Sequence, residues 1–127
     1  MITGHIDENL EARIGISVNA GADMGEIEFL LDTGFNGHLS VTRSLVDTLG
    51  LELQDVQSGI TADGRLGYFE TVDLDVVWHG RETTVRAQVL DEAMLGTRML
   101  KGYELVAVWN AGGIVSIRRI ESTTTND

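Results

Sequence analysis

One short segment of the sequence combines the residue types that hydrolytic chemistry needs. Asp32, Thr33 and Gly34 follow directly on the apolar run of residues 29–31. A carboxylate is rarely buried without a partner, so this run either exposes Asp32 at a strand end or places it for use. Two facing carboxylates can hydrolyse a peptide bond without a metal, because the ionised one takes a proton from water and the protonated one donates to the carbonyl oxygen. The simpler interpretation is a strand that enters a tight turn, where Asp and Gly are ordinary residues.

Other hydrolytic or metal chemistry has little support in the sequence. The chain has no cysteine, which excludes disulfides, thiolate metal sites and a cysteine nucleophile. His5, His38 and His79 adjoin no other ligand types at metal spacing, so we expect no metal site and no cofactor. Ser40 and Ser44 lack a nearby histidine and a nucleophile elbow, which argues against a serine hydrolase.

Length and charge limit the remaining classes. The chain has 127 residues, the size of one ordinary domain, and a net charge of −11 from 20 acidic and 9 basic residues. This charge opposes phosphate binding, so we expect no nucleic-acid partner. No apolar run approaches the length that spans a bilayer and the N-terminus has no leader pattern. We therefore expect a soluble, cytoplasmic protein without a membrane partner.

Alternating apolar and polar residues predict that strands position Asp32. The predicted strands are residues 13–18, 26–31, 56–61, 66–78, 83–90, 104–109 and 113–117. The strand that ends at Leu31 begins with alternation and finishes fully apolar, so it should start at the surface and end in the interior. Asp63-Gly64 is the signal of a two-residue hairpin turn.

The segment after Asp32 carries helical signals. Leu45, Val46 and Leu49 have helical spacing, with a possible cap at Ser40 or Thr42 and an end at Gly50. Residues 97–101 predict one further helical turn. Residues 1–10 are interpreted as a polar lead-in and residues 121–127 as a disordered polar tail. The sum is a single all-β domain over residues 1–120.

Taken together, these motifs resemble the retropepsin-like (clan AA) aspartic proteases, in the prokaryotic branch whose motif reads Asp-Thr-Gly-Phe. The resemblance runs from about Ile14 to about Ile117 and rests on four features in the family's order. They are the motif of residues 30–37, the helix that ends at residues 49–51, the hairpin of residues 61–65, and Met94-Leu95-Gly96 before a helical turn. The resemblance implies a closed or partly open β-barrel with one or two short helices and a β-hairpin flap.

The resemblance implies a homodimeric aspartic endopeptidase that acts on a peptide or protein substrate. The chain has one Asp-Thr-Gly, so a catalytic pair needs Asp32 from each of two copies related by a two-fold axis. Two close carboxylates cannot both ionise easily, and the pair would share one proton. By resemblance, Thr33 braces the loop across the axis and Gly34 leaves room for a substrate.

The resemblance also implies roles for residues around this pair of carboxylates. Phe35 and Asn36 would contact substrate, and the flap would exclude water over the bound peptide through Ala62, Asp63 and Gly64. A strand formed by Met94, Leu95 and Gly96 would back the catalytic loop.

One departure from the family concerns charge. Retroviral members pair a carboxylate two residues after the motif's glycine with an arginine after the later glycine, but this chain has Asn36 and Thr97 there. The joint loss of both charges predicts a neutral hydrogen bond between these residues.

Two alternatives to the enzyme remain open. One is a retropepsin-like dimeric module that binds peptide or serves as a scaffold and cleaves slowly or not at all. The other is a β-barrel domain cut from a larger assembly.

Overall fold

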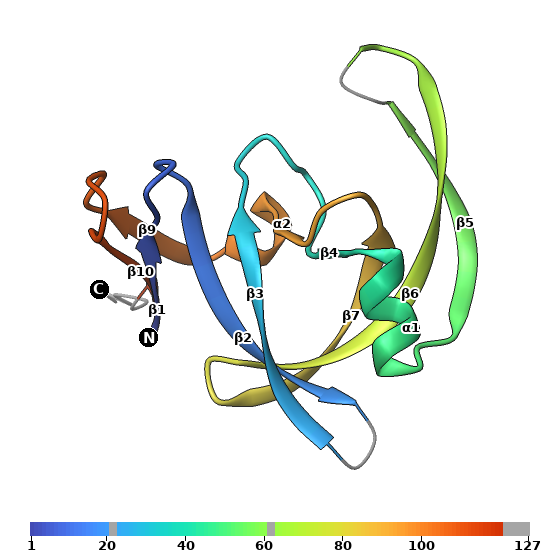
Figure 1. Ribbon diagram of the computed structural model, residues 1–127, viewed down its shortest axis with the longest axis horizontal. Helices are drawn as coiled ribbons and strands as arrows, with labels where there is room; N and C mark the ends of the chain where they lie inside the picture. Colours follow the sequence, from blue (N-terminus) through green and yellow to red (C-terminus); the bar gives the residue numbers. More distant parts are fainter. Residues whose placement is uncertain (21–22, 61–62, 121–127) are drawn as a thin grey trace, which may run out of the picture.

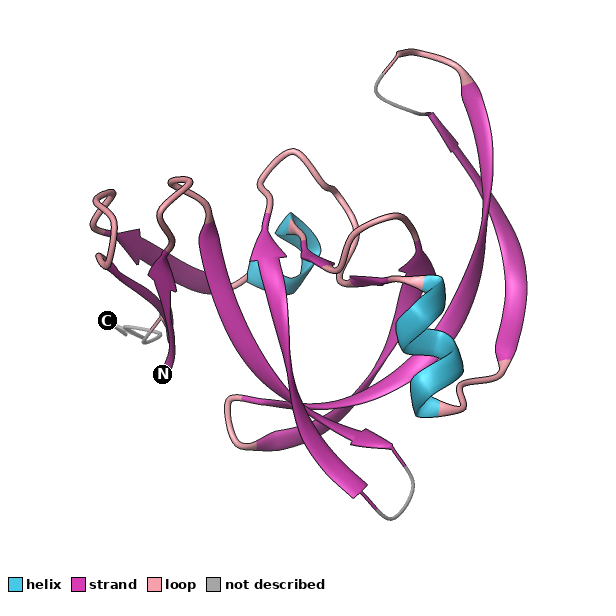
Figure 2. Ribbon diagram, in the orientation of Figure 1, coloured by secondary structure: helices cyan, strands magenta, loops and turns pink. Residues whose placement is uncertain are grey.

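Ten strands and two short helices make up the protein in a computed structural model that describes residues 1–20, 23–60 and 63–120 (Figures 1 and 2). The all-β class predicted from the sequence is confirmed. The strands are β1 (Ile2–Ile6), β2 (Ala12–Ala20), β3 (Asp23–Leu31), β4 (Ser40–Val41), β5 (Leu53–Ile60), β6 (Leu66–Trp78), β7 (Arg81–Val89), β8 (Met94–Leu95), β9 (Tyr103–Ala107) and β10 (Ile114–Arg119). The helices are α1 (Arg43–Leu49) and α2 (Thr97–Leu100).

The strands form one strongly curved sheet. Its main path runs β4-β7-β6-β2-β1-β10-β9, with β3 paired to β2 and β8, and β5 paired to β6. The two ends of the path, β4 and β9, are not paired with each other, so the sheet is not closed. Figure 1 shows the strands curving around a shared interior, with α1 across one side.

Alternation along the strands places the core inside this curve. In β2 the buried side chains are those of Ala12, Ile14, Ile16 and Val18, every second residue. β6 continues the same core with Val72, Leu74, Val76 and Trp78. Because a one-residue slip would move all of these side chains to the surface, this burial fixes the register between β2 and its neighbours.

Helix α1 has the ends that the sequence predicts. The Thr42 hydroxyl accepts a hydrogen bond from the N–H of Leu45 at 3.2 Å, and Gly50 follows the helix in a left-handed conformation with φ 65°. Among the described residues, no helix is long and apolar enough to cross a membrane.

Two sequence predictions about the fold are wrong. Residues 1–10 are not a lead-in, because β1 pairs with both β2 and β10 and buries Ile6 completely. The hairpin of β5 and β6 does not have a two-residue turn, because its last pair is Ile60 with Leu66. Gly64 there has φ 84°, which suits glycine alone. Ala62 and the tail of residues 121–127 lie outside the described residues.

Candidate active site

Asp32 lies at the end of β3, where the apolar run predicted it. β3 lies between β2 and β8, so Phe29, Leu30 and Leu31 are all buried. The strand continues as far as Asp32, whose N–H donates to the carbonyl of Leu95 at 3.0 Å. The Asp32 side chain is half-buried, at the boundary between core and solvent.

The chain turns sharply after Asp32 by using the carboxylate itself. Oδ1 of Asp32 accepts a hydrogen bond from the N–H of Gly34 at 2.8 Å, and the Asp32 carbonyl accepts one from the N–H of Phe35 at 3.1 Å. Among the described residues, Oδ2 accepts no hydrogen bond. One carboxylate oxygen is therefore held by the backbone, and the other is available to water or a ligand.

The segment from β8 to α2 fixes the loop of residues 32–38 through backbone hydrogen bonds. Three consecutive backbone N–H groups donate to its carbonyls, namely Gly96 to His38 at 2.9 Å, Thr97 to Phe35 at 2.9 Å and Arg98 to Gly37 at 3.2 Å. Such backbone bonds fix the loop without relying on flexible side chains. Leu95 and Gly96 thus bond directly to the segment of residues 32–38, whereas Met94 pairs with Leu30 in β3.

This contact requires glycine at position 96 because there is no room for a side chain, not because of the backbone conformation. Its φ of −103° is open to any residue. A Cβ at this position, however, would lie 2.2 Å from the carbonyl oxygen of Gly37 and 2.6 Å from that of Phe35. The loop can approach α2 this closely because position 96 has no side chain.

Ser40 anchors β8 from inside the core. Its fully buried hydroxyl donates to the Glu92 carbonyl at 2.7 Å and accepts from the N–H of Met94 at 3.0 Å. Burial excludes Ser40 as a nucleophile. The hydroxyl instead satisfies two backbone groups of the segment that positions Asp32.

Replacing this hydroxyl should destabilise the protein. Ser40→Ala leaves the two backbone groups without a partner, so the free energy of unfolding should fall by about 1–3 kcal/mol. Ser44→Ala, on the exposed face of α1, is the matched control and should change it by less than about 0.5 kcal/mol. Urea unfolding of the three proteins measures both values, and equal stabilities would refute the anchoring role.

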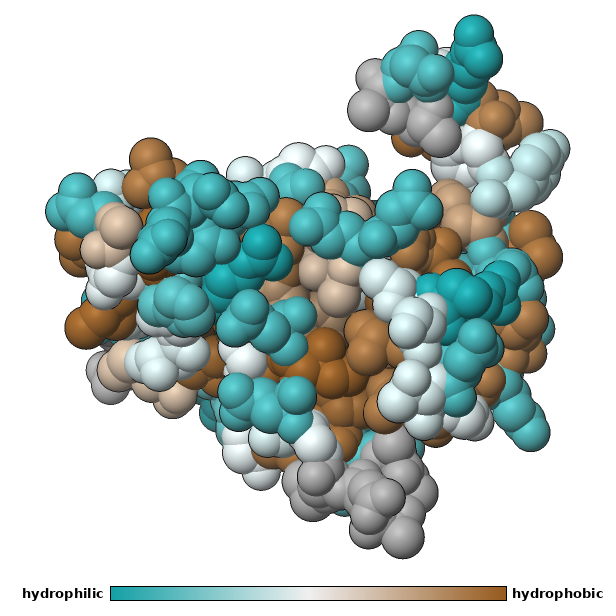
Figure 3. All heavy atoms as spheres, viewed as in Figure 1, coloured by the Kyte–Doolittle hydropathy of each residue, from teal (hydrophilic) through white to brown (hydrophobic). Residues whose placement is uncertain are grey.

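The β5–β6 hairpin overhangs the loop of residues 32–38. Figure 1 shows it rising from the body on the side where this loop lies, and Figure 3 shows its tip standing clear of the body. A pocket of about 530 Å³ lies between hairpin and loop. It is lined by Gly34, Phe35, Asn36, Gly37, Gln57, Ser58, Gly59, Ile60, Phe69, Gln88 and Arg98.

The structure thus brings together most of the predicted residues. Phe35 and Asn36 line the pocket, and Gly34 joins it to the Asp32 carboxylate. Thr33 is exposed in the turn, and its contact across a dimer axis stays a prediction. Asp63 and Gly64 are exposed at the hairpin's end and do not line the pocket.

Sequence reasoning missed several lining residues. Phe69, Gln88 and Arg98 come from β6, β7 and α2, and only long-range pairing of these elements brings them to the pocket. The predicted hydrogen bond between Asn36 and Thr97 is wrong. The Thr97 hydroxyl instead lies 3.4 Å from the Phe35 carbonyl, which already accepts the Thr97 N–H.

Arg98 is the charged residue of the pocket lining. Desolvation, with a smaller effect of the Arg98 charge, lowers the pKa of the nearby His38 below its usual range. The lowered pKa favours the neutral form of His38, and the positive charge on this side of the loop belongs to Arg98.

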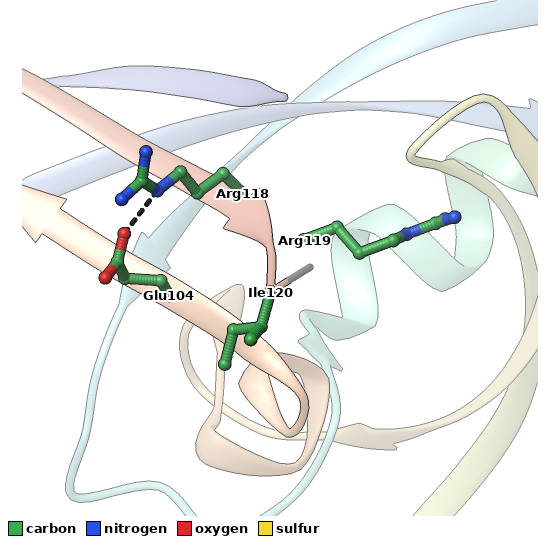
Figure 4. A pocket seen from close by; sticks show the side chains of 4 residues that line it. All are labelled: Glu104, Arg118, Arg119 and Ile120. Atoms are coloured by element: carbon green, nitrogen blue, oxygen red, sulfur yellow. Dashed lines mark hydrogen bonds and ion pairs between the residues drawn. The ribbon is translucent and has the colours of Figure 1, made fainter. Parts of the chain in front are cut away.

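A second pocket lies apart from the loop of residues 32–38. A pocket of about 360 Å³ is lined by Glu104, Arg118, Arg119 and Ile120, with Arg118 paired to Glu104 (Figure 4). No residue of the loop after Asp32 lines it. Among the described residues, no three His, Asp or Glu side chains gather as a metal site would require.

Comparison of the chain with family models, with curated proteins and with solved structures gave no match. The function is therefore inferred from the geometry of the site.

Proposed function

We propose that the protein is an aspartic endopeptidase that acts as a homodimer, with Asp32 of each chain supplying one of two paired carboxylates. The observation that carries this proposal is the placement of Asp32. It stands at the end of a buried strand, with one oxygen held by Gly34 and a pocket beginning at that same glycine. A surface turn needs no such backing from β8 and α2.

A second copy is needed to complete the chemistry. Among the described residues, the pocket lining contains no carboxylate, and Asp32 adjoins it through Gly34. A single carboxylate cannot serve as general base and general acid in the same step. A two-fold axis beside the exposed loop of residues 33–34 would bring in the equivalent Asp32, because a two-fold interface joins equivalent residues.

Exposed apolar side chains support association. Val56, Leu66 and Tyr68 lie on the face of the β5–β6 hairpin opposite Gln57 and Phe69, and the exposed fraction of Tyr68 is 72%. Apolar residues are also exposed where β9 turns into β10, at Val108 and Trp109. Exposed apolar groups of this kind commonly mark interaction surfaces.

The proposed mechanism needs one shared proton. The ionised carboxylate takes a proton from water as the water oxygen attacks the peptide carbonyl carbon, and the protonated carboxylate donates its proton to the carbonyl oxygen. The tetrahedral intermediate then collapses with cleavage of the C–N bond, and a proton passes to the leaving nitrogen. The hairpin would close over the peptide and exclude bulk water.

This mechanism predicts a bell-shaped dependence of cleavage on pH. At low pH both carboxylates are protonated and no base remains, whereas at high pH both are ionised and no acid remains. The experiment is digestion of a diverse peptide mixture across acidic to alkaline pH, with products identified by mass spectrometry. A rate that kept rising into the alkaline range would contradict the shared proton.

A peptide-binding module without catalysis is the second candidate. It is favoured by one observation, that residues of a single chain line the pocket, whereas a carboxylate pair needs a second chain. A dimer in solution that binds peptides from the mixture but cleaves none of them would support this candidate over the enzyme.

A further inference from the structure

We propose that the pocket beside Asp32 selects substrates with an acidic side chain, which the guanidinium of Arg98 recognises. This inference rests on the proposed function, because it takes the pocket to receive a side chain that flanks the cleaved bond. The proposed mechanism by itself specifies neither a specificity residue, here Arg98, nor a substrate class, here peptides with an acidic side chain.

The first support is the contrast between the pocket and the rest of the molecule. The chain carries a net charge of −11, but the pocket lining contains no acidic residue and one arginine. At physiological ionic strength, exposed charges more than about 8 Å away are largely screened. A group inside the pocket therefore responds mainly to the nearest charges, which are Arg98 in the lining and Asp32 beside Gly34.

The second support is that Arg98 has no carboxylate partner among the described residues, as is also true of Arg81 and Arg119 but not of the other five arginines. Arg13, Arg43, Arg65, Arg86 and Arg118 each lie within ion-pair distance of a carboxylate. No described carboxylate lies that close to the guanidinium of Arg98. Arg98 lines this pocket and a second one that includes His38 and Lys101, and its unpaired guanidinium is available to a ligand.

The third support is the position of Arg98 relative to Asp32. The N–H of Arg98 donates to the Gly37 carbonyl at 3.2 Å, so the residue is fixed to the loop that carries Asp32. Gly34 lies in the same lining and contacts the carboxylate of Asp32. An extended peptide that presents its bond to Asp32 would therefore direct a neighbouring side chain toward Arg98.

The remaining lining suits a side chain with an apolar stem and an anionic end. Phe35 and Phe69 provide apolar surface. Gln57 and Gln88 carry amide groups that can donate to a carboxylate without repelling it. Arginine offers a planar pair of donors that matches a carboxylate, so glutamate fits better than its amide.

The test uses matched peptides in which one residue beside the cleaved bond is Glu, Gln or Lys. The wild type should cleave the Glu peptide with a kcat/KM at least about tenfold above that of the Gln peptide. Arg98→Met should abolish this preference, and Arg98→Glu should shift it toward Lys. Arg81→Glu is the matched control, since Arg81 is exposed at the start of β7 and lines no part of the pocket. It makes the same change in net charge and should keep the Glu preference.

Binding separates this inference from the proposed function. The Asp32→Asn protein should bind the Glu peptide more tightly than the Gln peptide, and the difference should shrink as salt is raised. If the wild type cleaves nothing but this binding preference is present and needs Arg98, the selectivity stands and the protease fails. If peptides are cleaved or bound with no preference for Glu, or if Arg98→Met keeps the preference, the inference is overturned.

Discussion

Asp32→Asn should reduce peptide cleavage by at least about 1000-fold, because general acid–base catalysis by a positioned carboxylate contributes on this scale. The amide can neither take a proton from water nor share one with a partner carboxylate. It can still accept the hydrogen bond from the N–H of Gly34, since its side chain keeps a carbonyl oxygen. The turn and the fold should therefore remain.

Activity and structure must be measured together for this variant. The midpoint of thermal unfolding and the molecular mass in solution should match those of the wild type, while product peptides disappear from the mass spectrum. Cleavage at the wild-type rate would remove Asp32 from the mechanism. A variant that unfolds would instead assign Asp32 a structural role.

Gly96→Ala should have a large effect on both stability and cleavage, although it does not touch the carboxylate. The new Cβ would lie 2.2 Å from the Gly37 carbonyl oxygen and 2.6 Å from that of Phe35, which are backbone atoms and cannot rotate away. We expect the free energy of unfolding to fall by about 2–3 kcal/mol, as for overpacked sites. Cleavage should fall as well, because relieving the clash moves the loop that carries Asp32.

Gly25→Ala provides the matched control for this substitution. Gly25 lies in β3, the same strand that leads to Asp32, and a Cβ there meets no atom within 4 Å. Its stability should be unchanged or slightly higher, because alanine loses less backbone freedom on folding than glycine. Denaturant unfolding and cleavage assays of both variants test the contrast. Equal stability and equal cleavage rates of the two variants would show that the close contact between Gly96 and the loop is not needed.

The sequence could predict the features that depend on neighbouring residues. The fully apolar run before Asp32 predicts a strand buried on both faces, and β3 lies between β2 and β8 as that requires. The Thr42 and Gly50 ends of α1 are also local signals, and both are confirmed. The turn after Asp32 is also a local feature, because Asp and Gly two residues apart suffice to form it.

Features that depend on distant pairing could not be predicted in the same way. The polar residues of β1 resemble a lead-in until β2 and β10 are known to flank them and bury Ile6. Ser40 is a plausible helix cap in sequence, but its hydroxyl faces the segment of residues 92–94, more than fifty positions away. Arg98 lies on a helix of one turn, whose sequence does not indicate that the β5–β6 hairpin completes a pocket beside it.

The central claim is that one active site needs Asp32 from two chains, and mixing wild type with the Asp32→Asn protein tests it most directly. The two proteins are refolded together at constant total concentration and varied ratio, so that chains pair at random. If both carboxylates are required, activity follows the square of the wild-type fraction and an equal mixture retains about one quarter of full activity. A linear dependence, with about half of the activity in the equal mixture, would mean that each chain carries a complete site and would contradict the proposed dimeric protease.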